Sequence, residues 1–199
     1  MATITTRVGP SDDGRRMSLD EFEEAEGVEG HLYELGRGVI AVMQVPRTVH
    51  ALRVQAVRNT FTIYQLAHPE RVVLVAGGAE CRIVAADLES ERHPGVAIYM
   101  TPAPSDNPWA QWVPDIVVEG VSPGSEHRDY QEKPEEYLRF GVREYWIVDA
   151  KRQETLVLTR SKGKWAEKVL RPGEVHRTSL LPGFEFDCRT VFAVGSSES

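Results

Sequence analysis

The hydrophobic positions of the chain fall into many short runs and two longer periodic ones. The short runs predict β-strands, and REYWIVDA at 143–150 is apolar almost throughout, as in a strand covered on both faces. Apolar positions at helical spacing, among them Val57, Phe61 and Tyr64, predict a long helix over 46–67 that Pro69 closes. A second helix is predicted over about 129–140. The other predicted strands are two around a glycine-rich turn within 31–43, then 71–76, 81–86, 95–100 and 115–121, an edge hairpin at 155–160 and 164–170, and a short strand within 181–187.

Strands that alternate with two helices predict one mixed α/β domain, spanning residues 17–194. The polar residues 1–16 are predicted to form a loose N-terminal arm, and residues 195–199 a frayed tail. Between them, Ser18 and Glu21 predict a capping box at the start of a short acidic helix.

Composition narrows the class of protein. Hydrophobic residues at 41% and charged residues at 27% are typical of a globular domain. The two cysteines show no metal-binding spacing and suit a reducing compartment, and no apolar run is long enough to span a bilayer. The N-terminus lacks the apolar centre of a signal peptide, so we expect a cytoplasmic protein without membrane contact. The net charge of −7 counts against a non-specific DNA binder.

The stretch PDIVVEGV at 114–121 places two carboxylates in one predicted strand. Side chains alternate between the faces of a strand, so Asp115 and Glu119 point the same way but lie about 13 Å apart. One Mg²⁺ ion takes oxygens at about 2.0–2.1 Å and does not bridge that gap, so Asp115 is predicted to end the preceding loop instead. Glu119 lies inside an apolar strand, where a carboxylate is either paired with a cation or metal ion, or near the strand end and in contact with solvent or an arginine.

The block from 114 to 150 carries a recognisable order of residues. A strand ends in Glu119 and is followed by Ser-Pro, a helix with Asp129 and Lys133, then Tyr137, Gly-Val and the strand EYWIVD. This order resembles the Uma-two family of restriction-endonuclease-type proteins in the PD-(D/E)XK nuclease superfamily. MSLDEFEEAE, YELGRGVIAVM and PRTVHALRVQAV also resemble the family's opening helix, hairpin and long helix. The resemblance implies an α/β restriction-endonuclease-like PD-(D/E)XK core with a mixed β-sheet, one long helix and an added edge hairpin.

The same resemblance implies a Mg²⁺-dependent endonuclease that hydrolyses phosphodiester bonds of DNA. In the superfamily, a first-strand aspartate, the glutamate of the next strand and a backbone carbonyl hold Mg²⁺, which polarises the phosphate and lowers the pKa of the attacking water. Glu119 matches that glutamate. The usual lysine two residues later is Val121 here, and Lys133 on the following helix is the candidate that replaces it. Lys133 reads equally well as a solvated helix lysine, and Pro134 beside it removes one backbone donor.

The first-strand aspartate is missing, because the matching stretch RHPGVAIYM has Gly95 at that position. Glu34 matches a glutamate that the family carries near its active site, and it is predicted to hold the ion together with Glu119. His50 matches a family histidine, although a lone helix histidine is more often a packed or surface residue. With Glu119, Lys133 and Glu34 as catalytic candidates, we expect weak Mg²⁺ binding and weak or absent cleavage. The alternative is a non-catalytic nuclease-fold scaffold that binds a protein or nucleic acid.

Two further features bear on partners. The proline-rich loop at 101–114 holds Trp109 and Trp112, which we expect to fill a hydrophobic joint or a dimer contact rather than to stack on bases. An edge hairpin and an apolar loop are surfaces that proteins usually cover, so a homodimer is predicted. DNA is the predicted binding partner.

Overall fold

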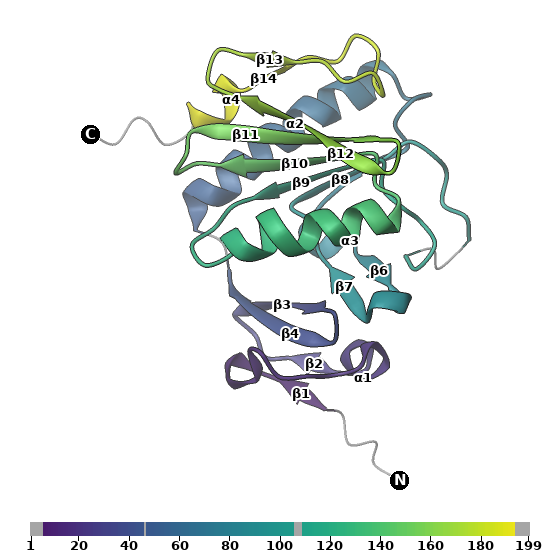
Figure 1. Ribbon diagram of the computed structural model, residues 1–199, viewed down its shortest axis with the longest axis vertical. Coiled ribbons are helices and arrows are strands. Elements are labelled where there is room, and N and C mark those ends of the chain that lie inside the picture. Colours follow the sequence, from purple (N-terminus) through teal and green to yellow (C-terminus); the bar gives the residue numbers. More distant parts are fainter. Residues whose placement is uncertain (1–5, 46, 106–108, 194–199) are drawn as a thin grey trace.

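The computed structural model describes residues 6–45, 47–105 and 109–193, and a six-stranded β-sheet lies at its centre (Figure 1). The strand order in this sheet is β12-β11-β10-β9-β8-β5. Only β9 and β10 run parallel among its neighbouring pairs, so the sheet is mixed, as predicted. Its strands are β5 (Leu74–Ala76), β8 (Val96–Tyr99), β9 (Ile116–Gly120), β10 (Glu144–Asp149), β11 (Glu154–Ser161) and β12 (Lys164–Leu170).

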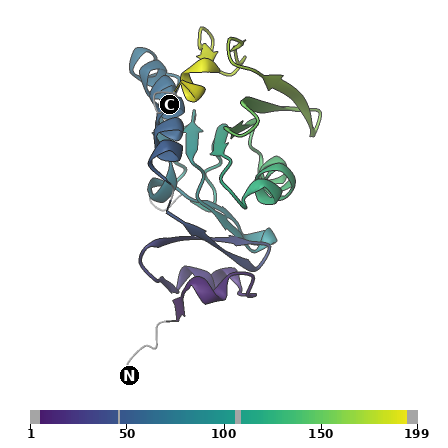
Figure 2. The same cartoon turned by 90° about the vertical axis from the view of Figure 1, so that its left-hand side faces the viewer.

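Helices cover both faces of this sheet (Figure 2). The long helix α2 (Thr48–Ala67) lies on one face and α3 (Lys133–Phe140) on the other. Because side chains alternate along a strand, Ile116 and Val118 of β9 pack toward α2, while Val117 packs toward α3. β9 therefore buries both faces, which explains why its sequence is largely apolar without alternation.

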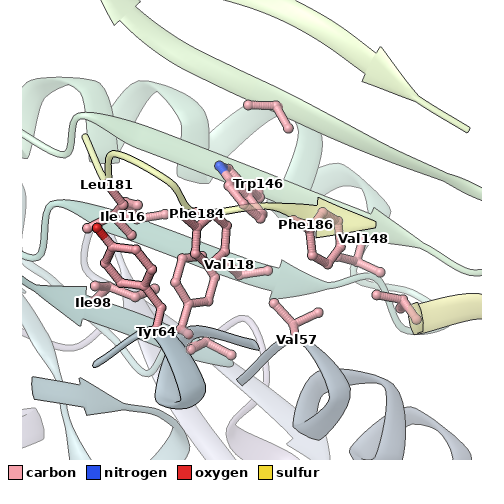
Figure 3. Packing of buried hydrophobic residues seen from close by; sticks show 14 of the residues in the cluster. Val57, Tyr64, Ile98, Ile116, Val118, Trp146, Val148, Leu181, Phe184 and Phe186 are labelled. Carbon is pink, nitrogen blue, oxygen red and sulfur yellow. The ribbon is translucent and has the colours of Figure 1, made fainter. Parts of the chain in front are cut away.

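The larger core cluster lies between α2 and the sheet (Figure 3). Phe61 is fully buried, and its ring stacks on Phe184 with centroids 4.6 Å apart and contacts Trp146 at 5.3 Å. Tyr64 contributes its ring to the same cluster and donates its hydroxyl to the carbonyl of Pro182. Burial of a large aromatic side chain contributes on the order of 2–3 kcal/mol, so this cluster fixes α2 against the sheet.

A second, four-stranded sheet lies beside the N-terminal part of the chain, in the order β4-β3-β7-β6 (Figure 1). Its β3 (His31–Gly36) and β4 (Val39–Gln44) form the predicted hairpin, with Arg37 and Gly38 both at positive φ in the turn. β6 (Ile83–Ala85) was predicted as well. β7 (Ser90–Arg92) was not, because its polar sequence Ser-Glu-Arg reads as a loop, although all three of its residues are buried.

Residues 6–16 are ordered, contrary to the expected loose arm. β1 (Arg7–Val8) pairs in parallel with β2 (Glu26–Gly27), and a 3-10 turn follows at Pro10–Asp12. Val8 explains the difference, because it is 2% exposed and packs in a cluster with Met17 and Leu19 against the N-terminal sheet. This segment thus contains a buried apolar residue, which its mostly polar composition did not indicate. Residues 1–5 and the predicted tail at 195–199 lie outside the described residues.

The remaining elements close the edges of the fold. The short helix α1 (Leu19–Glu23) begins with the predicted capping box, in which Ser18 accepts from the backbone N–H of Glu21. Trp109 and Trp112 pack against Tyr99 and each other, which confirms that they fill a hydrophobic joint.

No helix in the described part of the chain has the length and hydropathy of a membrane span. The other short elements are β13 (Val175–His176), β14 (Phe186–Asp187), α4 (Arg189–Phe192) and 3-10 turns at Gly78–Glu80 and Ala86–Leu88.

Candidate functional site

The candidate site begins where β8 and β9 lie side by side. Val96 of β8 pairs with Val118 of β9, so the next positions along the two antiparallel strands, Gly95 and Glu119, lie opposite each other. The backbone N–H of Gly95 donates to Glu119 Oε2 at 3.3 Å. A Cβ at position 95 would lie 3.9 Å from that oxygen. A side chain at position 95 would therefore lie next to Glu119. Position 95 is where the resemblance places the missing aspartate.

Lys133 lies in the middle of the carboxylates. Its Nζ contacts Glu119 Oε1 at 2.9 Å, Glu34 Oε1 at 3.4 Å and Asp129 Oδ1 at 3.5 Å. All four side chains are at most 8% exposed. The structure thus brings together Glu34 from the N-terminal sheet, Glu119 from the central sheet and Lys133 from α3. Lys133 is a buried cation and not the solvated lysine that was the alternative.

The helix geometry explains how Lys133 reaches this position. A π-helical turn at Arg128–Glu132 runs directly into α3, and the backbone N–H of Lys133 donates to the carbonyl of Arg128, five residues earlier. Pro134 follows and has no backbone N–H to donate to the preceding turn. Because a regular α-helical turn would lack a hydrogen bond at this position in any case, widening the turn sacrifices fewer hydrogen bonds here than it would elsewhere in a helix. Asp129 and Lys133 are four residues apart and share the inward face of this helix.

A buried arginine supports the same cluster. Arg92 of β7 is 1% exposed, and it binds Glu136 with two hydrogen bonds, from Nε at 2.9 Å and from Nη2 at 3.0 Å. Its Nη1 donates to Glu34 Oε2 at 3.3 Å. Glu34 is therefore held from two sides, by Arg92 on one oxygen and by Lys133 on the other. A planar guanidinium suits such a bidentate arrangement, whereas a lysine would supply only a point charge.

The pKa values of Glu34 and Glu119 are shifted in opposite directions. Burial alone would raise the pKa of Glu34, but the charges of Lys133 and Arg92 and the N–H of His93 outweigh it and lower this pKa to about 2. Burial is also the largest influence on Glu119, and Lys133 opposes it. The neighbouring carboxylates of Asp129 and Glu34 add to burial, so the pKa of Glu119 is raised. Tyr137 donates its hydroxyl to Glu119 Oε1 at 2.9 Å, which helps to hold this carboxylate in place.

His93 forms a second, smaller charged group beside the cluster. Its Nδ1 lies 3.1 Å from the carbonyl oxygen of Cys81, and its Nε2 lies 3.1 Å from Glu91 Oε1. The carbonyl of Cys81 and the ionised carboxylate of Glu91 both accept hydrogen bonds, so this arrangement favours a ring with protons on both nitrogens. Burial opposes this charge, but Glu91 and Glu34 prevail and raise the pKa of His93.

A cleft of about 640 Å³ opens beside these groups. Glu34, Gly95, Glu119 and Lys133 line it, and His50 from α2 lines it as well. The ring of His50 lies against Gly120, where a Cβ would come within 2.8 Å of its Cε1. Burial lowers the pKa of His50, so the ring favours its neutral form. Of the residues considered from the sequence, His50 lines the cleft and Asp115 does not.

Asp115 instead joins three strands, as expected for a residue that ends the preceding loop. Its Oδ2 accepts the backbone N–H of Met100 at 2.8 Å, and its Oδ1 accepts from Arg143 at 3.1 Å. Its backbone carbonyl accepts the N–H groups of Arg143 and Glu144. This aspartate secures the beginning of β9 next to β8 and β10.

Comparisons with known proteins bear on the fold and the family of this chain. A crystal structure described as a putative nuclease belonging to DUF820, from Anabaena variabilis, has a TM-score of 0.72 with this chain at 17% identity, and the match covers 89% of this chain and 98% of that one. The two proteins share a fold. A family model described as "Uma2: Putative restriction endonuclease" matches residues 19–191. The chain belongs to the Uma2 family. No curated protein matches it. The restriction-endonuclease-like α/β fold predicted from the sequence is thus confirmed.

The Uma2 family is described as one of restriction-endonuclease type. Restriction-endonuclease-like proteins generally use a divalent metal ion. The donor set of this Uma2 chain does not fit such an ion as it is arranged. Oε1 of Glu119 accepts from Lys133 and Tyr137, and Oε2 accepts from Gly95. Both oxygens of Glu34 face donors as well. Among residues 6–45, 47–105 and 109–193, no group of three or more His, Cys, Asp or Glu residues is placed to hold a metal ion.

Three members of the cluster, Asp129, Glu136 and Arg92, were not identified as site residues from the sequence. Asp129 had a usable signal, because a spacing of four residues from Lys133 places both on one helix face. Arg92 had none, since the segment Ser-Glu-Arg-His resembles a polar loop and its partners lie 58 and 44 residues away in the chain.

Proposed function

We propose that this Uma2 protein is a nuclease-type protein with a degenerate divalent-ion site, which hydrolyses phosphodiester bonds of DNA weakly or not at all. One observation carries the proposal. The ammonium group of Lys133 lies between Glu119 and Glu34, at 2.9 Å and 3.4 Å, in the position where a nuclease of this class would gather its metal ligands.

The physical argument concerns competition for the carboxylates. Mg²⁺ gives up its water ligands reluctantly and needs anionic oxygens to remain on a protein. Here the position opposite Glu119 is Gly95, which offers no carboxylate, and the oxygens of Glu34 and Glu119 are already held by cations and N–H groups. An ion would have to displace Lys133 from a buried position, and the displaced ammonium would lose three carboxylate contacts.

The second candidate is a Mg²⁺-dependent DNA endonuclease, and the charge balance of the cluster favours it. Among the residues that the structure describes, the buried carboxylates of Glu34, Glu119, Asp129 and Glu136 are matched by only two buried cations, Lys133 and Arg92. A surplus of negative charge attracts a divalent cation. In this candidate, Glu119 and Glu34 would hold the ion, the ion would supply the Lewis acid, and Lys133 would orient a water molecule.

A cleavage assay separates the two candidates. Supercoiled plasmid is incubated with the wild-type protein and Mg²⁺ or Mn²⁺, beside the variant Glu119→Gln, which keeps the shape of the side chain and removes its charge. Our proposal expects at most weak nicking by the wild type. Robust nicking by the wild type that Glu119→Gln abolishes would establish the endonuclease and overturn the degenerate site. Calorimetry with Mn²⁺ on the same two proteins reports whether Glu119 takes part in ion binding at all.

A further inference from the structure

Three basic side chains that line the cleft, Arg128, His50 and His31, form no ion pair with an acidic side chain among the described residues. Most other cations in the cleft wall are paired, Arg58 with Glu80, Arg82 with Glu23 and Glu91, and Lys133 with the central carboxylates. Arg128 and His50 form no hydrogen bond or ion pair through their side chains within the described part of the chain, and the charge of Asp129 acts on His50 without direct contact. The Nε of Arg128 is moreover shielded from solvent without a hydrogen-bond partner.

An unpaired buried donor calls for a partner, because it has lost its water without gaining a replacement. Arg128 comes from the π-helical turn and His50 from α2, and the structure presents both to one cleft. A guanidinium that lacks a carboxylate is well suited to the oxygens of a phosphate group.

The wall formed by the N-terminal sheet carries an apolar pair among polar side chains. Leu32 of β3 pairs directly with Met43 of β4, and Glu34 is two residues from Leu32, so the three side chains share one face of that sheet. Leu32 and Met43 both line the cleft, and Leu32 is 42% exposed, which is high for a leucine. The cleft therefore offers an apolar pair beside the unpaired guanidinium of Arg128 and the neutral ring of His50, a hydrogen-bond donor, which suits a ligand that carries an anionic group and a flat apolar one.

The size of the cleft and the net charge of the protein indicate whether such a ligand is part of a duplex or unpaired. A volume of about 640 Å³ lies in the range of small-ligand pockets. Glu119 and Lys133 at its base are at most 8% exposed, so a ligand reaches them only by entering the cleft. The stacked base pairs of a duplex keep each nucleotide out of such a space, whereas an unpaired nucleotide enters it. The net charge of −7 also opposes binding to a long array of duplex phosphates.

We infer that this cleft binds an unpaired nucleotide of single-stranded nucleic acid, with its phosphate on Arg128 and His50 and its base against Leu32 and Met43. The inference rests on the proposed nuclease-type function for the choice of nucleic acid as the ligand class. It does not depend on whether the protein cleaves, because neither Arg128 nor His50 belongs to the carboxylate cluster.

Fluorescence anisotropy in the presence of EDTA tests the inference without metal or cleavage. A labelled single-stranded oligonucleotide is compared with a duplex of the same sequence, on wild-type protein and on Arg128→Gln, His50→Gln and Arg177→Gln. Arg177 is the control, because it is exposed, pairs with Glu185 and lies outside the cleft. We expect the single strand to bind on the order of tenfold more tightly than the duplex, and Arg128→Gln to weaken it about tenfold, as for a lost charge-assisted hydrogen bond.

The controls make each outcome decisive. Arg177→Gln is expected to bind as the wild type does, and His50→Gln to bind more weakly, which keeps the test valid if Arg128→Gln fails to fold. Competition by a deoxynucleoside monophosphate is expected to exceed that of inorganic phosphate. Equal competition by phosphate would show a simple anion site, and preference for the duplex would show a surface for double-stranded DNA. Either result overturns the inference, as does the absence of binding. Cleavage in the plasmid assay leaves it standing.

Discussion

Lys133 Nζ lies 2.9 Å from Glu119 Oε1, and the same ammonium group is 3.4 Å from Glu34 Oε1. The two glutamates expected to share a metal ion thus share a lysine. This relationship joins the N-terminal sheet, the central sheet and α3 through one buried cation. It makes the cluster an element of stability as well as a candidate site.

Replacing the ammonium group is expected to destabilise the protein strongly. In Lys133→Met, the carboxylates of Glu119, Glu34 and Asp129 stay buried without their shared cation, and we expect a loss of about 3–5 kcal/mol in the free energy of unfolding. Urea unfolding at neutral pH measures it, with Lys168→Met on the exposed strand β12 as the control. The loss is expected to shrink near pH 5, because the orphaned carboxylates then take up protons. Equal stabilities of the two variants would contradict the assigned role of Lys133.

Restoring the missing carboxylate is expected to strengthen metal binding. The side chain of Gly95→Asp would start 3.9 Å from Glu119 Oε2 and would add a second anionic ligand beside it. We expect Mn²⁺ affinity to rise on the order of tenfold, as measured by isothermal calorimetry. Gly95→Asn is the matched control, because it meets the same close contact with the carbonyl of Val118, at 3.2 Å, without the charge. If Gly95→Asn raised the affinity as much, or Gly95→Asp not at all, position 95 would not be the missing ligand.

Arg92 is expected to resist replacement by lysine. Arg92→Lys keeps the charge but loses the two hydrogen bonds to Glu136 and the reach to Glu34. We expect a loss of about 2–4 kcal/mol, which corresponds to a fall in Tm of roughly 4–16 °C for a chain of this size. Arg177→Lys, in an exposed pair with Glu185, is the control and should change Tm by no more than about 2 °C. A small effect at position 92 would mean that its buried pairs contribute little.

His93 is expected to make stability depend on pH in a defined direction. Its pKa is raised in the folded protein, so its contribution is present in full below the unfolded value near 6.5 and is lost as the pH rises through the folded pKa. His93→Gln should therefore cost more stability at pH 6 than at pH 9 in urea unfolding. A loss that does not change with pH would argue against an imidazolium at position 93.

Neither cysteine is expected to react in the folded protein. Both are free and buried, burial raises the pKa of Cys188, and burial together with the charge of Glu119 raises that of Cys81 to about 12. Thiol reactivity requires the thiolate, which is scarce at neutral pH under these conditions. Titration with a thiol reagent should therefore give almost no reaction in the native state and two equivalents in denaturant. Rapid labelling of the native protein would show that one of the two sites opens.

Local patterns in the sequence determined the elements of this fold. The apolar runs of β9 and β10 and the periodic face of α2 predicted strands and a helix close to those observed, because their periods follow directly from backbone geometry. The capping box at Ser18 and the turn of the β3–β4 hairpin were likewise readable, since both depend on residues only a few positions apart. The order of residues from 114 to 150 was enough to place the chain in its family.

Only the tertiary structure decided what the charged residues do. The sequence named Glu34, Glu119 and Lys133, but it left open whether the lysine faced solvent, and it missed Arg92. Glu34 and Arg92 lie 58 residues apart, and no local periodicity reports a pairing over such a separation. The same limit hid Val8, whose burial depends on partners supplied by later parts of the chain. Local structure follows from neighbours in sequence, whereas the partner of a buried charge is set by how distant elements pack.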